Sequence, residues 1–167
     1  MPKIVKFKSQ VEKDFAVGFY DSGIEHADKG NFIQSIADFT KVIQLNPSVP
    51  EAYYNRGIAY NKVGNLTEAI ADFAKVIKLN PNDPRAYCFR GSAYGEQGNF
   101  PQAMADFNKA IDVSPHSSIA FHNRAVMYFQ LKEYDKAWGD VHKAEELGAK
   151  VNPEFIGLLK IASGNDH

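Results

Sequence analysis

Charged residues return along this chain at a fixed interval, and they are the first side chains whose chemistry needs an explanation. Arginine recurs every 34 residues, at Arg56, Arg90 and Arg124, and aspartate keeps the same interval at Asp38, Asp72, Asp106 and Asp140. A row of guanidinium groups suits phosphate binding, whereas opposite charges in register suit a ladder of ion pairs. We favour the structural ladder, because a half-buried arginine without its partner is costly. Pairs within a repeat and pairs between repeats both remain open.

Known catalytic patterns are missing. The sequence contains no His-Glu-x-x-His, Gly-x-Gly-x-x-Gly, Gly-Lys-Ser/Thr loop or Gly-x-Ser-x-Gly. His122 has no second metal ligand at helical spacing, and His26 is expected to be a packed helix residue. Cys88 is the only cysteine, so an internal disulfide and a cysteine zinc site are excluded. We therefore predict a protein that is not an enzyme and that has no metal and no cofactor.

Composition indicates an ordinary globular chain. Its 167 residues include 19 basic and 20 acidic side chains, a balance that gives no general attraction to nucleic acid or to an anionic membrane. The first residues lack the apolar stretch of a signal peptide, and no run approaches the ~20 apolar residues that a membrane span needs. We expect a soluble, cytoplasmic protein.

The 34-residue interval extends well beyond the charges. Residues 53–81 read Tyr-x2-Arg-Gly-x2-Tyr, then Ala-x3-Phe, then Pro, and residues 87–115 repeat this pattern, with weaker copies on both sides. Apolar residues recur at three- and four-residue spacing and are interrupted at Gly64. That period predicts two helices in each repeat. Gly57 and Ala69 are small enough to let the paired helices approach closely, and Pro81 ends the unit.

These motifs resemble the tetratricopeptide repeat family over about residues 16–151, in four copies. The resemblance implies an all-α fold, a helix-turn-helix repeat solenoid in which antiparallel helix pairs form a right-handed superhelix. We place the repeats at about 10–49, 50–83, 84–117 and 118–151. A flexible N-terminal extension is expected over 1–9, and a C-terminal capping helix and tail over 152–167.

Both ends of the array carry helix-start signals. Ser9 and Glu12 form a capping box that predicts a helix from about Gln10, and Asn152 with Pro153 predicts a terminal helix. That helix has a stripe expected to cover the fourth repeat, made of Phe155, Leu158, Leu159 and Ala162. Ile156 and Ile161 fall off the stripe, as peripheral packing or as an edge for self-association.

The resemblance also implies where a partner binds. In this family the concave wall is formed mainly by the first helix of each repeat, in columns that packing does not need. Here those columns hold aromatic, aliphatic and amide side chains, which suit an extended peptide or a helix. The predicted wall comprises Tyr20, Ile24, Tyr54, Asn55, Ile58, Lys62, Arg85, Cys88, Phe89, Ser92, His122, Asn123, Val126 and Phe129.

One function known in the family is not expected. Members that bind the C-terminal carboxylates of heat-shock chaperones carry a Lys and an Asn, then an Asn, then a Lys and an Arg. In this chain the first pair would be Tyr20 and Ile24, or Tyr54 and Ile58 one repeat later. In the first register, Phe89 stands where the Arg should be. Asn55 and Arg85 are the matching positions. Heat-shock chaperone C-termini are therefore unlikely partners.

The leading hypothesis is a non-enzymatic protein–protein interaction scaffold that binds a partner peptide or helix in its groove. The alternative is a structural assembly protein, a homo-oligomer that associates through its terminal helix and the array ends. Under both hypotheses the partner is protein, with no nucleic acid and no membrane.

Overall fold

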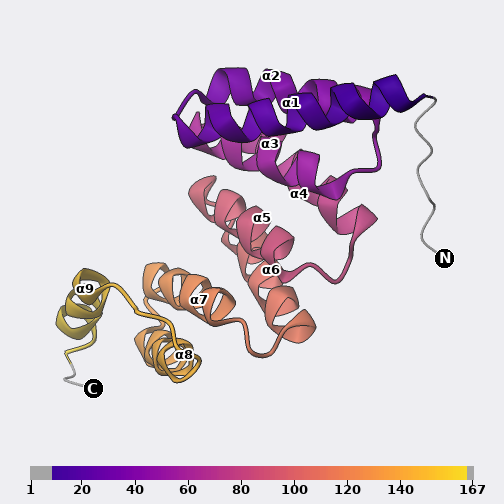
Figure 1. Cartoon of the computed structure of the whole chain (residues 1–167). Helices are drawn as coiled ribbons and strands as arrows, with labels where there is room; N and C mark the ends of the chain where they lie inside the picture. Colours follow the sequence, from indigo (N-terminus) through magenta and orange to yellow (C-terminus); the bar gives the residue numbers. More distant parts are fainter. Residues whose placement is uncertain (1–8, 165–167) are drawn as a thin grey trace. The chain divides into compact units, whose positions relative to one another are not determined.

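A computed structural model describes residues 9–164, in which helices joined by short turns and linkers are the only regular secondary structure (Figure 1). The expected extension, except Ser9, and the last three residues lie outside the described residues. The all-α prediction is confirmed. The helices are α1 (Gln10–Asp28), α2 (Phe32–Leu45), α3 (Pro50–Lys62), α4 (Leu66–Leu79), α5 (Pro84–Glu96), α6 (Phe100–Val113), α7 (Ser118–Gln130), α8 (Tyr134–Glu146) and α9 (Pro153–Ser163).

Consecutive helices pack as pairs, α1 with α2, α3 with α4, α5 with α6 and α7 with α8, and α9 packs on α8. The chain divides after Pro81 into two compact units. The first unit holds the first two pairs, and the second holds the other two pairs and α9. Glycine in the left-handed conformation turns the chain within the first three pairs, for example Gly64 at φ 80°. Lys132 takes this role in the fourth pair at φ 60°.

The paired helices meet at a glycine on the first helix and a phenylalanine on the second. Phe73 is fully buried, and a Cβ atom placed on Gly57 would lie 2.9 Å from its ring. The pairs Gly23–Phe39 and Gly91–Phe107 have the same geometry. The fourth pair instead brings together Ala125 and Val141, both fully buried. Compared with the other pairs, the fourth pair has alanine in place of glycine on the first helix and valine in place of phenylalanine on the second. The larger residue on one helix is thus matched by a smaller one on the other, as close packing requires.

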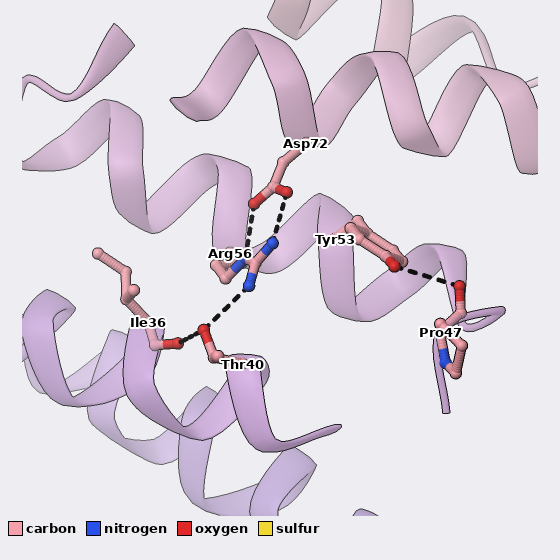
Figure 2. Close-up of polar contacts among 6 residues, drawn as sticks. All are labelled: Ile36, Thr40, Pro47, Tyr53, Arg56 and Asp72. Atoms are coloured by element: carbon pink, nitrogen blue, oxygen red, sulfur yellow. Dashed lines mark hydrogen bonds and ion pairs between the residues drawn. The ribbon is translucent and has the colours of Figure 1, made fainter. Parts of the chain in front are cut away.

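In the three repeats that carry the arginine, it pairs with the aspartate of its own repeat, as Figure 2 shows for Arg56 and Asp72. Arg56 donates from Nε and Nη2 to the two carboxylate oxygens of Asp72, both at 2.8 Å. Arg90–Asp106 and Arg124–Asp140 repeat this two-bond geometry at 2.7–2.8 Å. The bonds to Asp72 raise the pKa of Arg56, and burial raises the pKa of Asp72 against the opposing effect of Arg56. Of the two arrangements that the sequence left open, the structure has the pair within a repeat at Arg56, Arg90 and Arg124.

The same guanidinium also reaches the preceding repeat. Arg56 Nη1 donates to Thr40 Oγ1 at 2.9 Å, and Thr40 Oγ1 donates to the Ile36 carbonyl at 2.7 Å (Figure 2). Beside them, Tyr53 Oη donates to the Pro47 carbonyl at 3.2 Å. In the second unit, Arg124 Nη1 donates to Asn108 Oδ1 at 2.7 Å. One arginine therefore links the two helices of its own repeat and the helix before them.

The first repeat replaces this arginine with two smaller groups. Asp38 accepts a hydrogen bond from Ser22 Oγ at 2.7 Å and lies 2.8 Å from His26 Nδ1. His26 is half-buried, as expected of a packed helix residue. Its specific partner, Asp38, was not foreseen.

The two terminal helices begin where the caps predict. Ser9 Oγ accepts from the Glu12 amide at 3.2 Å, and Asn152 Oδ1 accepts from the Glu154 amide at 2.9 Å.

The stripe predicted on α9 is correct only in part. Phe155 and Leu159 pack onto the fourth repeat, but Ile156 packs with them. Leu158, Ala162 and Ile161 are exposed. The buried side of α9 is therefore the one that carries Phe155, Ile156 and Leu159, and Ser163 near its end accepts from Trp138 Nε1 at 3.2 Å.

We predict that the pair Gly57 and Phe73 can be replaced by alanine and valine together, because the contact depends on the summed volume of the two side chains. Gly57→Ala should cost about 1–3 kcal/mol by overpacking, and Phe73→Val a similar amount through the cavity that it leaves. The double variant copies Ala125 with Val141 and should lose at least ~1 kcal/mol less than the sum, measured by urea unfolding. Gly139→Ala is the control, because Gly139 has open space around it; it should stabilise by roughly 0.5–1 kcal/mol. Strict additivity of the two changes would contradict the volume match.

We also predict that Arg56→Lys destabilises the chain by about 1–2 kcal/mol although the charge is kept. Lysine cannot donate in parallel to both oxygens of Asp72 and also reach Thr40. Arg85→Lys is the matched control, because Arg85 also pairs with a neighbouring aspartate, Asp83, but is largely exposed. The two free energies of unfolding should differ clearly, and equal values would mean that the ladder contributes only net charge.

Candidate functional site

All residues of the predicted wall lie on first helices of the repeats, on α1 and α3 in the first unit and on α5 and α7 in the second. Most of their side chains are half-buried, which leaves part of each surface open. The half-buried members are Tyr20, Ile24, Tyr54, Asn55, Ile58, Phe89, Ser92, His122, Asn123, Val126 and Phe129. Lys62 and Arg85 are exposed. Cys88 is the exception, because its side chain is only 3% exposed and is not offered to a partner.

In the first unit the aromatic wall residues rest on the buried phenylalanines. The ring edge of Tyr20 meets Phe39 at 5.6 Å between centroids, and Tyr54 meets Phe73 in the same way at 6.1 Å. Asn55 Nδ2 donates to Tyr20 Oη at 2.9 Å. Burial raises the pKa of Tyr20, so this phenol stays neutral. These contacts hold the aromatic side chains in place before any partner arrives.

In the second unit three predicted wall residues, Ser92, Asn123 and Val126, meet in a pocket of about 230 Å³ between α5 and α7. Asn123 Nδ2 donates to Ser92 Oγ at 3.4 Å. An amide carries two N–H groups and a carbonyl oxygen, so one bond does not exhaust it. The full lining is Ser92, Gly95, Glu96, Phe107, Asn123, Val126, Met127 and Gln130. The pocket therefore combines apolar groups with several hydrogen-bonding ones.

The sequence-based wall missed the residues that shape this pocket. A Cβ atom placed on Gly95 would lie 2.7 Å from Met127 Cε, so the absence of a side chain at 95 makes room for the methionine. The signal was present in the repeat columns. Asn61 and Phe129 stand where Gly95 does, and Ala59 stands where Met127 does. The residue at one repeat position is smaller than its counterparts, and the residue at the position that it contacts is larger. Such a paired change in side-chain size indicates that the packing differs locally.

The last part of the predicted wall is in contact with the terminal helix. The ring of Phe155 on α9 meets His122 at 5.9 Å and Phe129 at 5.6 Å, both edge to face. Burial lowers the pKa of His122, so its imidazole is neutral at pH 7. This packing takes up surface on both side chains that we had expected to face a ligand.

Asp83, the N-cap of α5, and Arg85 in its first turn are hydrogen-bonded to each other. Asp83 caps α5 by accepting from the Arg85 amide at 3.0 Å, and Arg85 Nη2 donates to Asp83 Oδ2 at 2.8 Å. These hydrogen bonds lower the pKa of Asp83. Burial raises the pKa of Cys88 to about 12, so this thiol is a poor nucleophile. Neither Asp83 nor Cys88 is therefore set up for covalent chemistry.

Residues 9–164 contain no cluster of three or more His, Cys, Asp and Glu side chains that could hold a metal ion. Over the same residues, no helix has both the length and the apolar character needed to cross a membrane.

Solved structures with helical repeats resemble this chain. The structure of MamA from residue 41 to its end, from Desulfovibrio magneticus RS-1, is 25% identical, with a TM-score of 0.74 over 79% of this chain and 75% of that one. A thermophilic TPR protein from Thermus thermophilus is 21% identical, with a TM-score of 0.75 over 89% and 83%. The first TPR of Spaghetti (RPAP3), solved with the HSP90 peptide SRMEEVD, is 22% identical, with a TM-score of 0.67 over 71% and 94%.

No curated protein sequence matches this chain. Two family models do match, one described as tetratricopeptide repeat at residues 50–83 and 84–117, the other as TPR repeat at residues 23–64. Together they span residues 23–117, more than half of the chain. With the helix pairs, the periodic glycines and the structural relatives, these matches lead to one conclusion: the chain belongs to the tetratricopeptide repeat family.

Proposed function

We propose that this protein is a non-enzymatic interaction scaffold that binds a peptide or helix of a partner protein on the first helices of its repeats. The observation that carries the proposal is the pocket between α5 and α7, where Ser92, Asn123 and Val126 meet. These columns differ from repeat to repeat, while the glycine–phenylalanine contacts recur in the first three repeats and the arginine pairs in the last three. A surface that varies over a constant scaffold is where a partner can be selected.

The chemistry of the pocket favours one apolar side chain of an extended peptide. Phe107, Val126 and Met127 supply apolar contacts, and methionine adapts its shape readily to different partners. Asn123 and Gln130 carry amides that can bond a peptide backbone. About 230 Å³ holds one side chain and no folded element. Specificity in such a site comes from a few buried anchors, with a polar rim around them.

The charges of these helices do not favour an acidic C-terminal peptide. On α5 the Arg85 guanidinium is already paired with Asp83, and Glu96 lines the pocket. Phe89 stands where a chaperone-binding repeat would need an arginine. The SRMEEVD peptide that binds the Spaghetti repeat is therefore a suitable negative probe.

We expect peptides selected on the immobilised chain from a random 12-residue library to lose affinity when the pocket changes. Asn123→Ala and Val126→Ala should each weaken binding by about 1–2 kcal/mol, as should Tyr54→Ala or Phe89→Ala for peptides that use those anchors. Fluorescence anisotropy gives the affinities, and circular dichroism checks that each variant is folded.

Lys109→Ala, at an exposed position of α6, is the matched control and should leave binding unchanged. The SRMEEVD peptide should bind no better than a scrambled peptide. If the selected peptides bind all four variants as well as the original chain, the first helices are not the binding surface and the proposal fails.

The second candidate function, self-association, is favoured by one observation on α9. Leu158 and Ile161 are 51% and 83% exposed on this terminal helix, which is short and strongly apolar. If α9 joins two copies, Ile161→Ser should lower the average mass measured by light scattering across a dilution series. A monomer at every concentration would eliminate this candidate.

A further inference from the structure

The first helix exposes an apolar stripe that the wall residues do not use. Val11 and Phe15 on α1 are 60% and 59% exposed, and a Cβ atom placed on Gly18 would have no neighbouring atom within 4 Å. With Ser22 these residues are spaced by four, three and four positions, so they lie along one line of the helix. A pocket of about 350 Å³ opens beside Phe15, Gly18, Phe19 and Ser22.

The next repeat shows what this side of a first helix normally contacts. One period later, Ala52 and Tyr53 on α3 are buried, whereas Gly18 is exposed and Phe19 only half-buried. In α3 that side is packed by α2, through Arg56 with Thr40, and by the segment that follows α2, through Tyr53 with Pro47 (Figure 2). The corresponding side of α1 is covered by no helix of the described residues. It is thus a helix-packing surface that lacks its helix.

Acidic side chains line one flank of the stripe. Asp14, Asp21 and Asp28 are spaced by seven residues and therefore follow the stripe along the helix. Glu25 lies on the same flank, paired with Lys29 at the end of α1. This flank carries no basic residue between Asp14 and Asp28. A helix packed on the stripe would meet carboxylates along its whole length.

We propose that the outer face of α1, formed by Val11, Phe15, Gly18 and Ser22, binds an amphipathic helix of a partner whose apolar stripe is flanked by Lys or Arg. The partner helix would cover α1 as α2 covers α3. Its apolar side chains would contact Phe15 and fill the space over Gly18, and its basic flank would pair with Asp14 and Asp21. A second copy of α1 fits less well, because antiparallel pairing on this stripe brings Asp14 of one copy toward Asp21 of the other.

The probe is a pair of fluorescein-labelled 18-residue peptides with the same leucine stripe, one flanked by Lys and the other by Glu. On the full chain at low salt, the Lys peptide should bind at least ~10-fold more tightly than the Glu peptide, and this preference should shrink as salt is raised. Phe15→Ser, Gly18→Leu, and Asp14→Asn with Asp21→Asn should each weaken the Lys peptide by about tenfold. Gly18→Leu is informative because it favours the helix while it blocks the pocket.

Ile119→Ser and Asp112→Asn, both exposed and in the second unit, are the matched controls and should change nothing. Three results would overturn the proposal: equal affinity for the two peptides, no binding of either, or affinity lost in Tyr54→Ala or Phe89→Ala but kept in Phe15→Ser. The last result would place the peptide on the wall and leave the proposed function intact. A dimer that Phe15→Ser dissociates, seen by sedimentation, would assign the face to a second copy and also overturn it.

Discussion

The contact between a glycine on the first helix and a buried phenylalanine on the second is the constraint on which the rest of the fold depends. At Gly57 even one added carbon would lie 2.9 Å from the ring of Phe73, closer than non-bonded carbons tolerate. The fourth repeat shows that the requirement is for summed volume and not for glycine itself, since Ala125 packs with Val141. Once this distance is set, the spacing of every helix pair follows from it.

Close approach of the helices brings the arginine within reach of both neighbours. Arg56 can bond Asp72 in its own repeat and Thr40 in the preceding one only because the three helices meet at this point. The ladder is therefore a consequence of the close packing and reinforces it. Charges held in this way are not available to a ligand, which excludes a phosphate-binding role for this arginine.

The repeat leaves specific positions unconstrained, and these are the positions at which we propose that partners bind. On the inner columns, Gly95 and Met127 depart from their neighbours in size and shape the pocket beside Val126. On the outer side of α1, Phe15 and Gly18 occupy positions that correspond to a covered surface in the next repeat. Both surfaces arise where the 34-residue pattern changes or ends.

Much of the fold could be predicted from the sequence, because the interval and the helical period are local properties. The repeats, the helix starts at Ser9 and Asn152 and the arginine columns were all visible in this way. Which side of α9 is buried was not visible, since it depends on contacts with distant residues, such as the bond from Trp138 to Ser163 across 25 positions. Apolar side chains can look equivalent in a helical pattern, and only contacts between residues distant in the sequence decide which of them are buried.

The sequence alone determined that the chain is a helical repeat protein, because each unit repeats the same local signals and requires the same packing. Only the tertiary structure decided which wall residues are open. It buried Cys88, placed Phe155 against His122 and Phe129, and opened the pocket beside Gly95. The physical reason is that exposure depends on the neighbouring helix. The position of that helix depends on the summed volumes of the side chains on both sides of the interface. These side chains come from several positions of the repeat, so no single position predicts the sum.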